Sequence, residues 1–189
     1  MLEKYKHELG VLKASYYIDE NELLREKCRD MERLKSLLAN GEELIEQVKD
    51  EDPKYKLMGS MANLYRINRD LDRSLDYLKL CLQYSERTED YDFYIKTLIR
   101  YAKSLKYVRK YENAIALLEL ALEKCYMYNL EKYEHYAWQQ LGKCYLELGD
   151  IYEAEKCFYK AYKLRVIQGA KHLFHASQKA LEFVSKIKR

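Results

Sequence analysis

A repeat of 40 residues is the feature of this sequence that most limits the folds open to it. Aligning the 189-residue chain with itself superimposes three consecutive segments, residues 55–94, 95–134 and 135–174. Positions 8, 20 and 27 of every segment carry small residues: Ala62, Ala102 and Gly142; Ser74, Ala114 and Ala154; Cys81, Ala121 and Ala161. A period of this length indicates stacked units that share one continuous core.

Large apolar residues recur between the small ones at helical spacing. They occupy positions 4, 7, 11 and 24 of the repeat: Met58, Leu98 and Trp138; Met61, Tyr101 and Leu141; Tyr65, Leu105 and Tyr145; Leu78, Leu118 and Phe158. Because side chains three or four residues apart share a helix face, each repeat is predicted to be two helices, A and B. The whole chain has only six glycines and one proline, too few turn residues for an all-β domain.

This pattern resembles the tetratricopeptide repeat. The third segment carries nearly the whole signature of that family: Trp138, Leu141, Gly142, Tyr145, Gly149, Ala154, Phe158 and Ala161. The usual repeat has 34 residues, so these units are lengthened and are similar to those of Rap-type peptide sensors. The resemblance implies an all-α, right-handed solenoid of three helix pairs that binds a protein or peptide and is not an enzyme.

The two ends are predicted to cap this solenoid, so that residues 1–189 form a single helical domain. Residues 1–54 carry apolar side chains at helical spacing and predict two or three helices, with breaks near Asp19 and at Gly41. This N-terminal cap is acidic, with 10 basic and 14 acidic residues. Residues 171–189 predict a polar-faced capping helix.

The A helices are predicted to carry a basic face opposite their packed face. The segments 55–68, 95–108 and 135–148 hold seven lysines and arginines and one acidic residue, although the net charge of the chain is only +3. The resemblance implies that this face lines a concave groove. The candidate binding residues are Lys56, Asn63, Arg66, Lys96, Arg100, Lys103, Lys106, Tyr107, Tyr136, Gln140 and Lys143. A basic groove favours an acidic peptide or an acidic partner surface.

No motif for catalysis or for a cofactor is present. The chain lacks the glycine-rich nucleotide loops, the zinc-protease motif and the serine-hydrolase motif. His172 and His175 have metal-ligand spacing but no companion ligands, so no metal is predicted. There is no apolar leader or membrane-length apolar stretch, and the five cysteines show no paired spacing. These features predict a cytoplasmic protein with reduced thiols.

The sequence is also compatible with two other functions. The small size and the acidic N-terminal cap also suit an immunity or inhibitor protein that neutralises a toxin with a basic surface. Nucleic acid could follow the basic face, with Tyr107 and Tyr136 stacking on bases. The small net charge and the acidic cap make nucleic-acid binding the less favoured of these two hypotheses.

Overall fold

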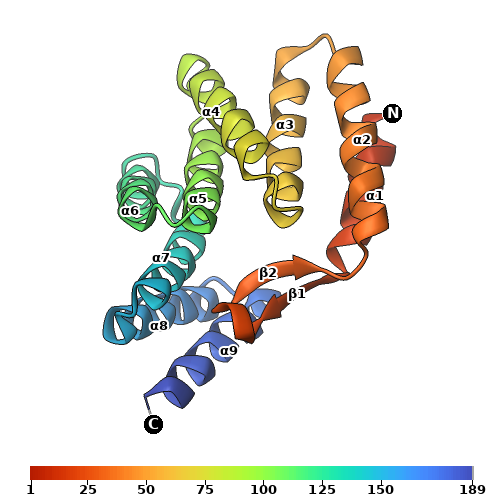
Figure 1. Ribbon diagram of the computed structural model, residues 1–189. Helices are drawn as coiled ribbons and strands as arrows, with labels where there is room; N and C mark the ends of the chain where they lie inside the picture. Colours follow the sequence, from red (N-terminus) through yellow and green to blue (C-terminus); the bar gives the residue numbers. More distant parts are fainter. Residues whose placement is uncertain (189) are drawn as a thin grey trace.

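The computed structural model is a stack of antiparallel helix pairs preceded by a helix, a β-hairpin and a second helix (Figure 1). It describes residues 1–188 except the side chains of Lys171 and His172, so the His172–His175 pair lies outside the described residues. The elements in chain order are α1 (Leu2–Lys13), β1 (Tyr16–Asp19), the 3₁₀ helix η1 (Glu20–Glu22), β2 (Arg25–Cys28), α2 (Met31–Gln47), α3 (Glu51–Ile67), α4 (Leu71–Arg87), α5 (Tyr91–Tyr107), α6 (Tyr111–Met127), η2 (Glu131–Tyr133), α7 (Glu134–Leu148), α8 (Ile151–Ile167) and α9 (Lys171–Ile187).

The repeat appears in the structure as three packed helix pairs, α3 with α4, α5 with α6, and α7 with α8. Their second helices begin at Leu71, Tyr111 and Ile151, which are 40 residues apart. The chain is therefore an all-α solenoid, as its sequence predicts. Pro53 lies inside the first turn of α3, where its missing N–H leaves no helix hydrogen bond unmade.

Aspartates define where several of these helices begin. The carboxylates of Asp70, Asp90 and Asp150 each accept a hydrogen bond from the backbone N–H three residues on, at 3.3, 2.9 and 3.0 Å. Such N-caps satisfy backbone donors that the first helical turn leaves free. Asp70 and Asp150 therefore mark the starts of α4 and α8. Gly149 ends α7 with a φ of +84°, a left-handed conformation that glycine adopts without steric cost.

The small residues of the repeat lie where neighbouring helices touch. Gly142 on α7 faces the fully buried ring of Phe158 on α8. A Cβ at residue 142 would lie 2.5 Å from that ring, closer than two carbon atoms can approach. The requirement for a small residue at this position is therefore a packing requirement.

Replacing Gly142 by alanine is expected to lower the free energy of unfolding by about 1–3 kcal/mol, the usual cost of overpacking a core. Gly10 provides the matched control, because nothing lies within 4 Å of a Cβ at that helical position. Gly10→Ala should raise stability by about 0.5–1 kcal/mol through helix propensity. Urea unfolding followed by circular dichroism measures both. Equal effects at the two glycines would contradict the close packing of α7 on α8.

The N-terminal segment differs from its prediction. The helix predicted between the breaks near Asp19 and at Gly41 is wrong in its first part, because residues 16–28 form an antiparallel hairpin with Tyr16 opposite Cys28. The break expected at Gly41 is also absent, since α2 runs continuously past this residue. A Cβ on Gly41 would lie 2.5 Å from the sulfur of Met61 on α3. This glycine therefore permits close helix packing and does not end a helix.

The hairpin leaves the α1–α2 end of the molecule and crosses toward α9 (Figure 1). Two-stranded hairpins are at best marginally stable alone in water. This one is stabilised by what it lies on: Leu24, at its tip, belongs to the same apolar cluster as Phe158 and Val184. The hairpin thereby joins the two ends of the solenoid across the faces of α3, α5 and α7.

Candidate functional site

The first helices of the three pairs form the surface on which binding is predicted. Helix α3 contacts α5, and α5 contacts α7. We call the face of α3, α5 and α7 that is turned toward the hairpin the inner surface (Figure 1). The hairpin divides this surface into an open part and a covered part, and the predicted residues fall into both.

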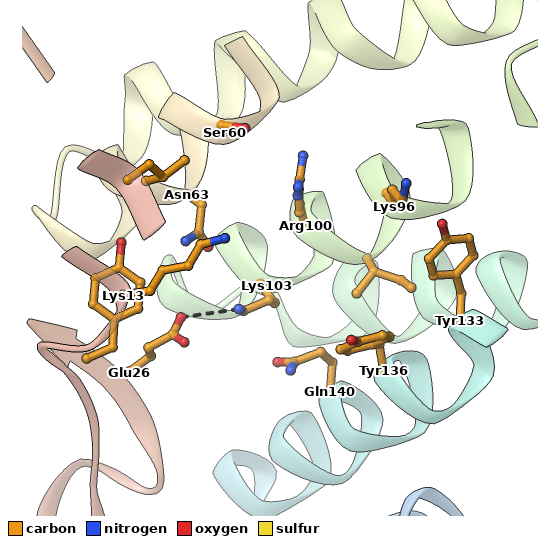
Figure 2. Close-up of a pocket in the computed structure, with 13 residues that line it drawn as sticks. Lys13, Glu26, Ser60, Asn63, Lys96, Arg100, Lys103, Tyr133, Tyr136 and Gln140 are labelled. Atoms are coloured by element: carbon orange, nitrogen blue, oxygen red, sulfur yellow. Dashed lines mark hydrogen bonds and ion pairs between the residues drawn. The ribbon is translucent and has the colours of Figure 1, made fainter. Parts of the chain in front are cut away.

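The open part is a pocket of about 570 Å³ (Figure 2). Its walls come from α1, the hairpin, α3, α5 and the η2–α7 segment. The lining residues are Leu9, Lys13, Tyr16, Glu26, Ser60, Asn63, Lys96, Ile99, Arg100, Lys103, Tyr133, Tyr136 and Gln140. Six of the predicted binding residues are among them. The pocket therefore brings these six residues of α3, α5 and α7 together.

Arg100 is a partly buried cation of this pocket. Figure 2 shows its side chain between those of Asn63 and Lys96. Among the described residues it forms no hydrogen bond or ion pair, and burial lowers the pKa of its guanidinium from the ordinary value. Arginine nevertheless keeps its charge in proteins. A half-buried cation without a counter-ion favours an anionic ligand, because that ligand would relieve the cost of desolvating the charge.

Two amide side chains give the pocket further polar groups for a ligand. The Oδ1 atom of Asn63 accepts a hydrogen bond from Arg66 at 2.7 Å, which orients the amide and leaves its NH₂ group unused. The Oε1 atom of Gln140 is buried without a donor among the described residues. A buried acceptor that receives no hydrogen bond costs free energy of desolvation. Together the amides offer a donor and an acceptor, which are the groups that bind a peptide backbone.

Two of the predicted cations at the α3–α5 end are paired with neighbouring carboxylates. Lys96 lies 2.5 Å from Asp92 and lines the pocket. Lys56 lies at the half-exposed edge, 2.6 Å from Asp52, outside the pocket lining. Exposed pairs of this kind contribute at most about 1 kcal/mol, so a ligand can replace the carboxylate at small cost.

The hairpin covers four other predicted residues: Arg66, Lys106, Tyr107 and Lys143. The hydroxyl of Tyr107 accepts a hydrogen bond from the Glu26 N–H at 2.9 Å and donates one to the Glu26 carbonyl at 3.1 Å. Arg66 donates to the Glu26 carboxylate at 2.5 Å. Lys143 donates to the carbonyl of Leu24 at 2.7 Å. The backbone of the hairpin and its Glu26 carboxylate are thus already bound by these side chains.

The Glu26 carboxylate lies between several cations and is shared with the pocket through Lys103, at 3.3 Å (Figure 2). Burial alone would raise its pKa, but the charges of Lys103, Arg66 and Lys143 hold the pKa of this carboxyl well below its usual range. Burial lowers the pKa of Lys103 to about 8. Burial and the neighbouring Lys106 charge lower the pKa of Lys143 to about 7. Three basic side chains thus share this one carboxylate.

Glu147 is a site residue that the sequence prediction missed. Its side chain is only 2% exposed and forms ion pairs with Lys106 at 2.6 Å and with Arg25 of the hairpin at 2.5 Å. It is the single acidic residue of the predicted A helices, and that exception to the basic pattern was the available signal. Glu26 gave a weaker signal, because in sequence it is one of many acidic residues in the N-terminal cap.

The acidic N-terminal cap is largely occupied by internal contacts. Within the hairpin, Glu22 pairs with Lys27 and with Arg69 of the α3–α4 turn, both at 2.5 Å. Glu26 pairs with Arg66. These carboxylates are therefore engaged with the chain itself, and the idea that the cap meets a basic toxin stays a prediction.

A metal site and a membrane-spanning helix are both absent from the described part of the chain. No group of three or more His, Cys, Asp or Glu side chains there is placed to hold a metal ion. Likewise, none of the described helices is long and apolar enough to cross a membrane.

Comparison with known proteins supports the repeat and the fold. A tetratricopeptide-repeat family model matches residues 135–165, and no curated protein matches the sequence. PlcR of Bacillus thuringiensis, in complex with the peptide PapR7 and DNA, is similar with a TM-score of 0.69 and 20% identity, over 95% of this chain and 69% of that one.

Two Rap proteins are similar as well. A Rap protein complexed with competence and sporulation factor gives a TM-score of 0.65 at 25% identity, over 79% of this chain and 40% of that one. Apo RapI gives 0.63 at 20% identity, over 85% and 58%. The chain thus spans about half the length of these relatives. It contains a tetratricopeptide repeat at residues 135–165, and its architecture is the helical solenoid of tetratricopeptide-repeat proteins.

Proposed function

We propose that this chain is a non-enzymatic binding protein that holds an acidic peptide segment in the open pocket of its inner surface. The observation that carries the proposal is Arg100, a half-buried cation with no counter-ion among the described residues. A volume of about 570 Å³ falls within the range of small-ligand pockets. It suits a few residues of an extended segment and not a whole domain.

Some pocket residues would bind the charge of such a ligand, and others would bind its backbone. A ligand carboxylate would bind Arg100 and approach Lys103, which shares Glu26 with Arg66. Charge-assisted hydrogen bonds of this kind are the strongest in proteins. Asn63 and Gln140 would bind the peptide amides. The Tyr136 ring, 37% exposed at the pocket wall, offers an apolar face with a polar tip.

Two further facts are consistent with this role. Solved structures of similar fold include PlcR with the peptide PapR7 and a Rap protein with competence and sporulation factor. All five cysteines of the chain are buried and free, as expected in a reducing compartment such as the cytoplasm.

Fluorescence anisotropy with a labelled heptapeptide carrying glutamate at alternate positions tests the proposal. The control is the same peptide with lysine in place of glutamate. Only the glutamate peptide should bind. Its affinity should fall as salt rises from roughly 0.1 M to roughly 1 M, because the Debye length then shrinks from about 10 Å to about 3 Å. Equal binding of the two peptides, or binding indifferent to salt, would overturn the proposal.

Binding is also expected to take up protons near pH 8. Burial places the pKa of Lys103 at about 8, so this lysine is about half protonated there. A ligand carboxylate nearby favours the charged form and should raise that pKa. Affinity should therefore fall, by about tenfold at most, as pH rises from 7 to 9. Calorimetry at pH 8 in two buffers of different ionisation enthalpy measures the uptake. It should shrink in Lys103→Met, and a buffer-independent enthalpy in the wild type would contradict the placement of the ligand.

A further inference from the structure

The geometry points to a second peptide-binding site on the inner surface, filled in this structure by the chain's own segment Leu24–Glu26. We call it the covered site and define it by the residues that hold this segment: Arg66, Tyr107, Lys143, Glu147 and the apolar cluster around Phe158 and Val184. Its free ligand would be a partner segment of matching chemistry, with an apolar, a cationic and an acidic residue in that order. Such a segment would bind by displacing the hairpin.

Every residue of Leu24–Glu26 is held by side-chain contacts from distant helices. The Leu24 side chain is 2% exposed in an apolar cluster, and its carbonyl accepts from Lys143. Arg25 donates two hydrogen bonds to the Glu147 carboxylate, at 3.1 and 2.5 Å. Alternating backbone contacts and side-chain pockets are how folded domains recognise an extended peptide.

Glu26 completes this recognition. The Tyr107 hydroxyl binds both its N–H and its carbonyl, and Arg66 binds its carboxylate. The guanidinium groups of Arg25, Arg66 and Arg69 also lie 4.7–5.1 Å from the Tyr107 ring centre, within cation–π range. The site thus binds both the backbone and the side chain of Glu26. Of the three positions in Leu24–Glu26, the acidic one is therefore recognised most specifically.

The hairpin does not set this conformation by itself. It has two strands with four residue pairs, too few for stability without support. At its tip, Leu23 and Leu24 have φ values of +49° and +63°, a left-handed conformation that leucine rarely adopts. Backbone strain of this kind persists only where surrounding contacts impose it. Once released from the covered site, the segment should therefore lose its order.

The connection to the chain makes the hairpin a strong competitor. A short tether gives an attached ligand a millimolar effective concentration. A partner segment added from solution must overcome that competition, and its apparent affinity is reduced by the small fraction of open sites. Weakening the hairpin while leaving the site residues unchanged should therefore increase the affinity for the partner segment.

The experiment uses the full chain and a labelled peptide with the sequence of residues 22–28, in which serine replaces Cys28. The test variant carries Leu24→Ala and Glu26→Gln, and the matched control is Glu20→Gln in the same hairpin. We expect the double variant to bind the peptide at least about tenfold more tightly than wild type, and the control to bind like wild type. A peptide with lysine in place of Glu26 should not bind.

Hydrogen–deuterium exchange shows whether the hairpin has left its site. Amides of residues 16–28 should lose protection in the double variant while those of α3 to α8 keep theirs. If the variant keeps its helical protection but binds no more tightly, the covered site is not a peptide site. If the variant does not fold, excess peptide on the wild-type chain decides: protection of residues 16–28 should fall, and unchanged protection overturns the inference. The glutamate heptapeptide, titrated on the wild-type chain and on Arg100→Gln, tests the open pocket separately, because Glu26, which lines both sites, is unchanged in these two chains.

Discussion

Replacing Glu147 by alanine is expected to lower the free energy of unfolding by about 3–5 kcal/mol. The Glu147 and Lys106 side chains are each only 2% exposed, and their charged groups are 2.6 Å apart. Glu147 also binds Arg25 of the hairpin and accepts a hydrogen bond from Tyr111 at 3.1 Å. Without this carboxylate, Lys106 would be a buried charge left with the centre of the Tyr107 ring, 4.7 Å away, and the hairpin would lose the ion pair of Arg25.

A double variant separates the loss of a partner from the loss of the pair. Replacing Lys106 by methionine and Glu147 by leucine together removes both charges and keeps the volume, so most of the lost stability should return. Glu119→Ala, at an exposed position on α6, is the control and should change stability by less than about 0.5 kcal/mol. Chemical unfolding measures all three. If Glu147→Ala were as stable as the control, the buried ion pair would not be a structural element.

Replacing Arg100 by glutamate is expected to weaken binding of the glutamate heptapeptide by about 100-fold or more. Removing one partner of a buried charge pair at an interface typically costs 2–5 kcal/mol, and tenfold in affinity corresponds to about 1.4 kcal/mol. The reversed charge adds repulsion from the peptide. Arg100→Gln, which removes the charge but keeps a polar side chain, should give the smaller loss.

Lys79→Glu is the matched control for the Arg100 variants. Lys79 is exposed on α4, outside the residues that line the pocket, so the same change in net charge should leave affinity within about twofold. The Arg100→Gln variant is expected to fold, because the substitution removes an uncompensated charge from a half-buried position. An Arg100→Glu chain that is folded and still binds like wild type would contradict the role given to this arginine.

The repeat part of the fold was predictable because it depends on local pattern. Spacing of three and four residues defined the helix faces, and aspartates marked helix starts at Asp70 and Asp150. The hairpin was not predictable in the same way. Leu24, Cys28 and Met31 have helical spacing in the sequence, but Leu24 is held by Lys143, 119 residues away. Long-range contacts of this kind override local preference.

In the candidate site, too, the local features were predictable and the long-range contacts were not. Counting charges along the A helices selected six residues that line the pocket, because helix geometry fixes which residues share a face. It could not distinguish Arg66 and Lys106, whose charges are neutralised inside the chain, from Arg100, whose charge is not. That distinction depends on Glu26 and Glu147, and on a hairpin that the sequence pattern did not reveal.

The central claim is that an acidic peptide binds the open pocket of the inner surface, and an NMR titration tests it most directly. Amide and methyl signals of the ¹⁵N,¹³C-labelled full chain are followed while the glutamate heptapeptide is added. We predict saturable shifts at residues lining the pocket, led by Asn63, Ile99, Arg100 and Gln140, and none on the outer faces of α4, α6 and α8. Shifts confined to those outer faces or to the acidic N-terminal cap, or no shifts at saturating peptide, would contradict it.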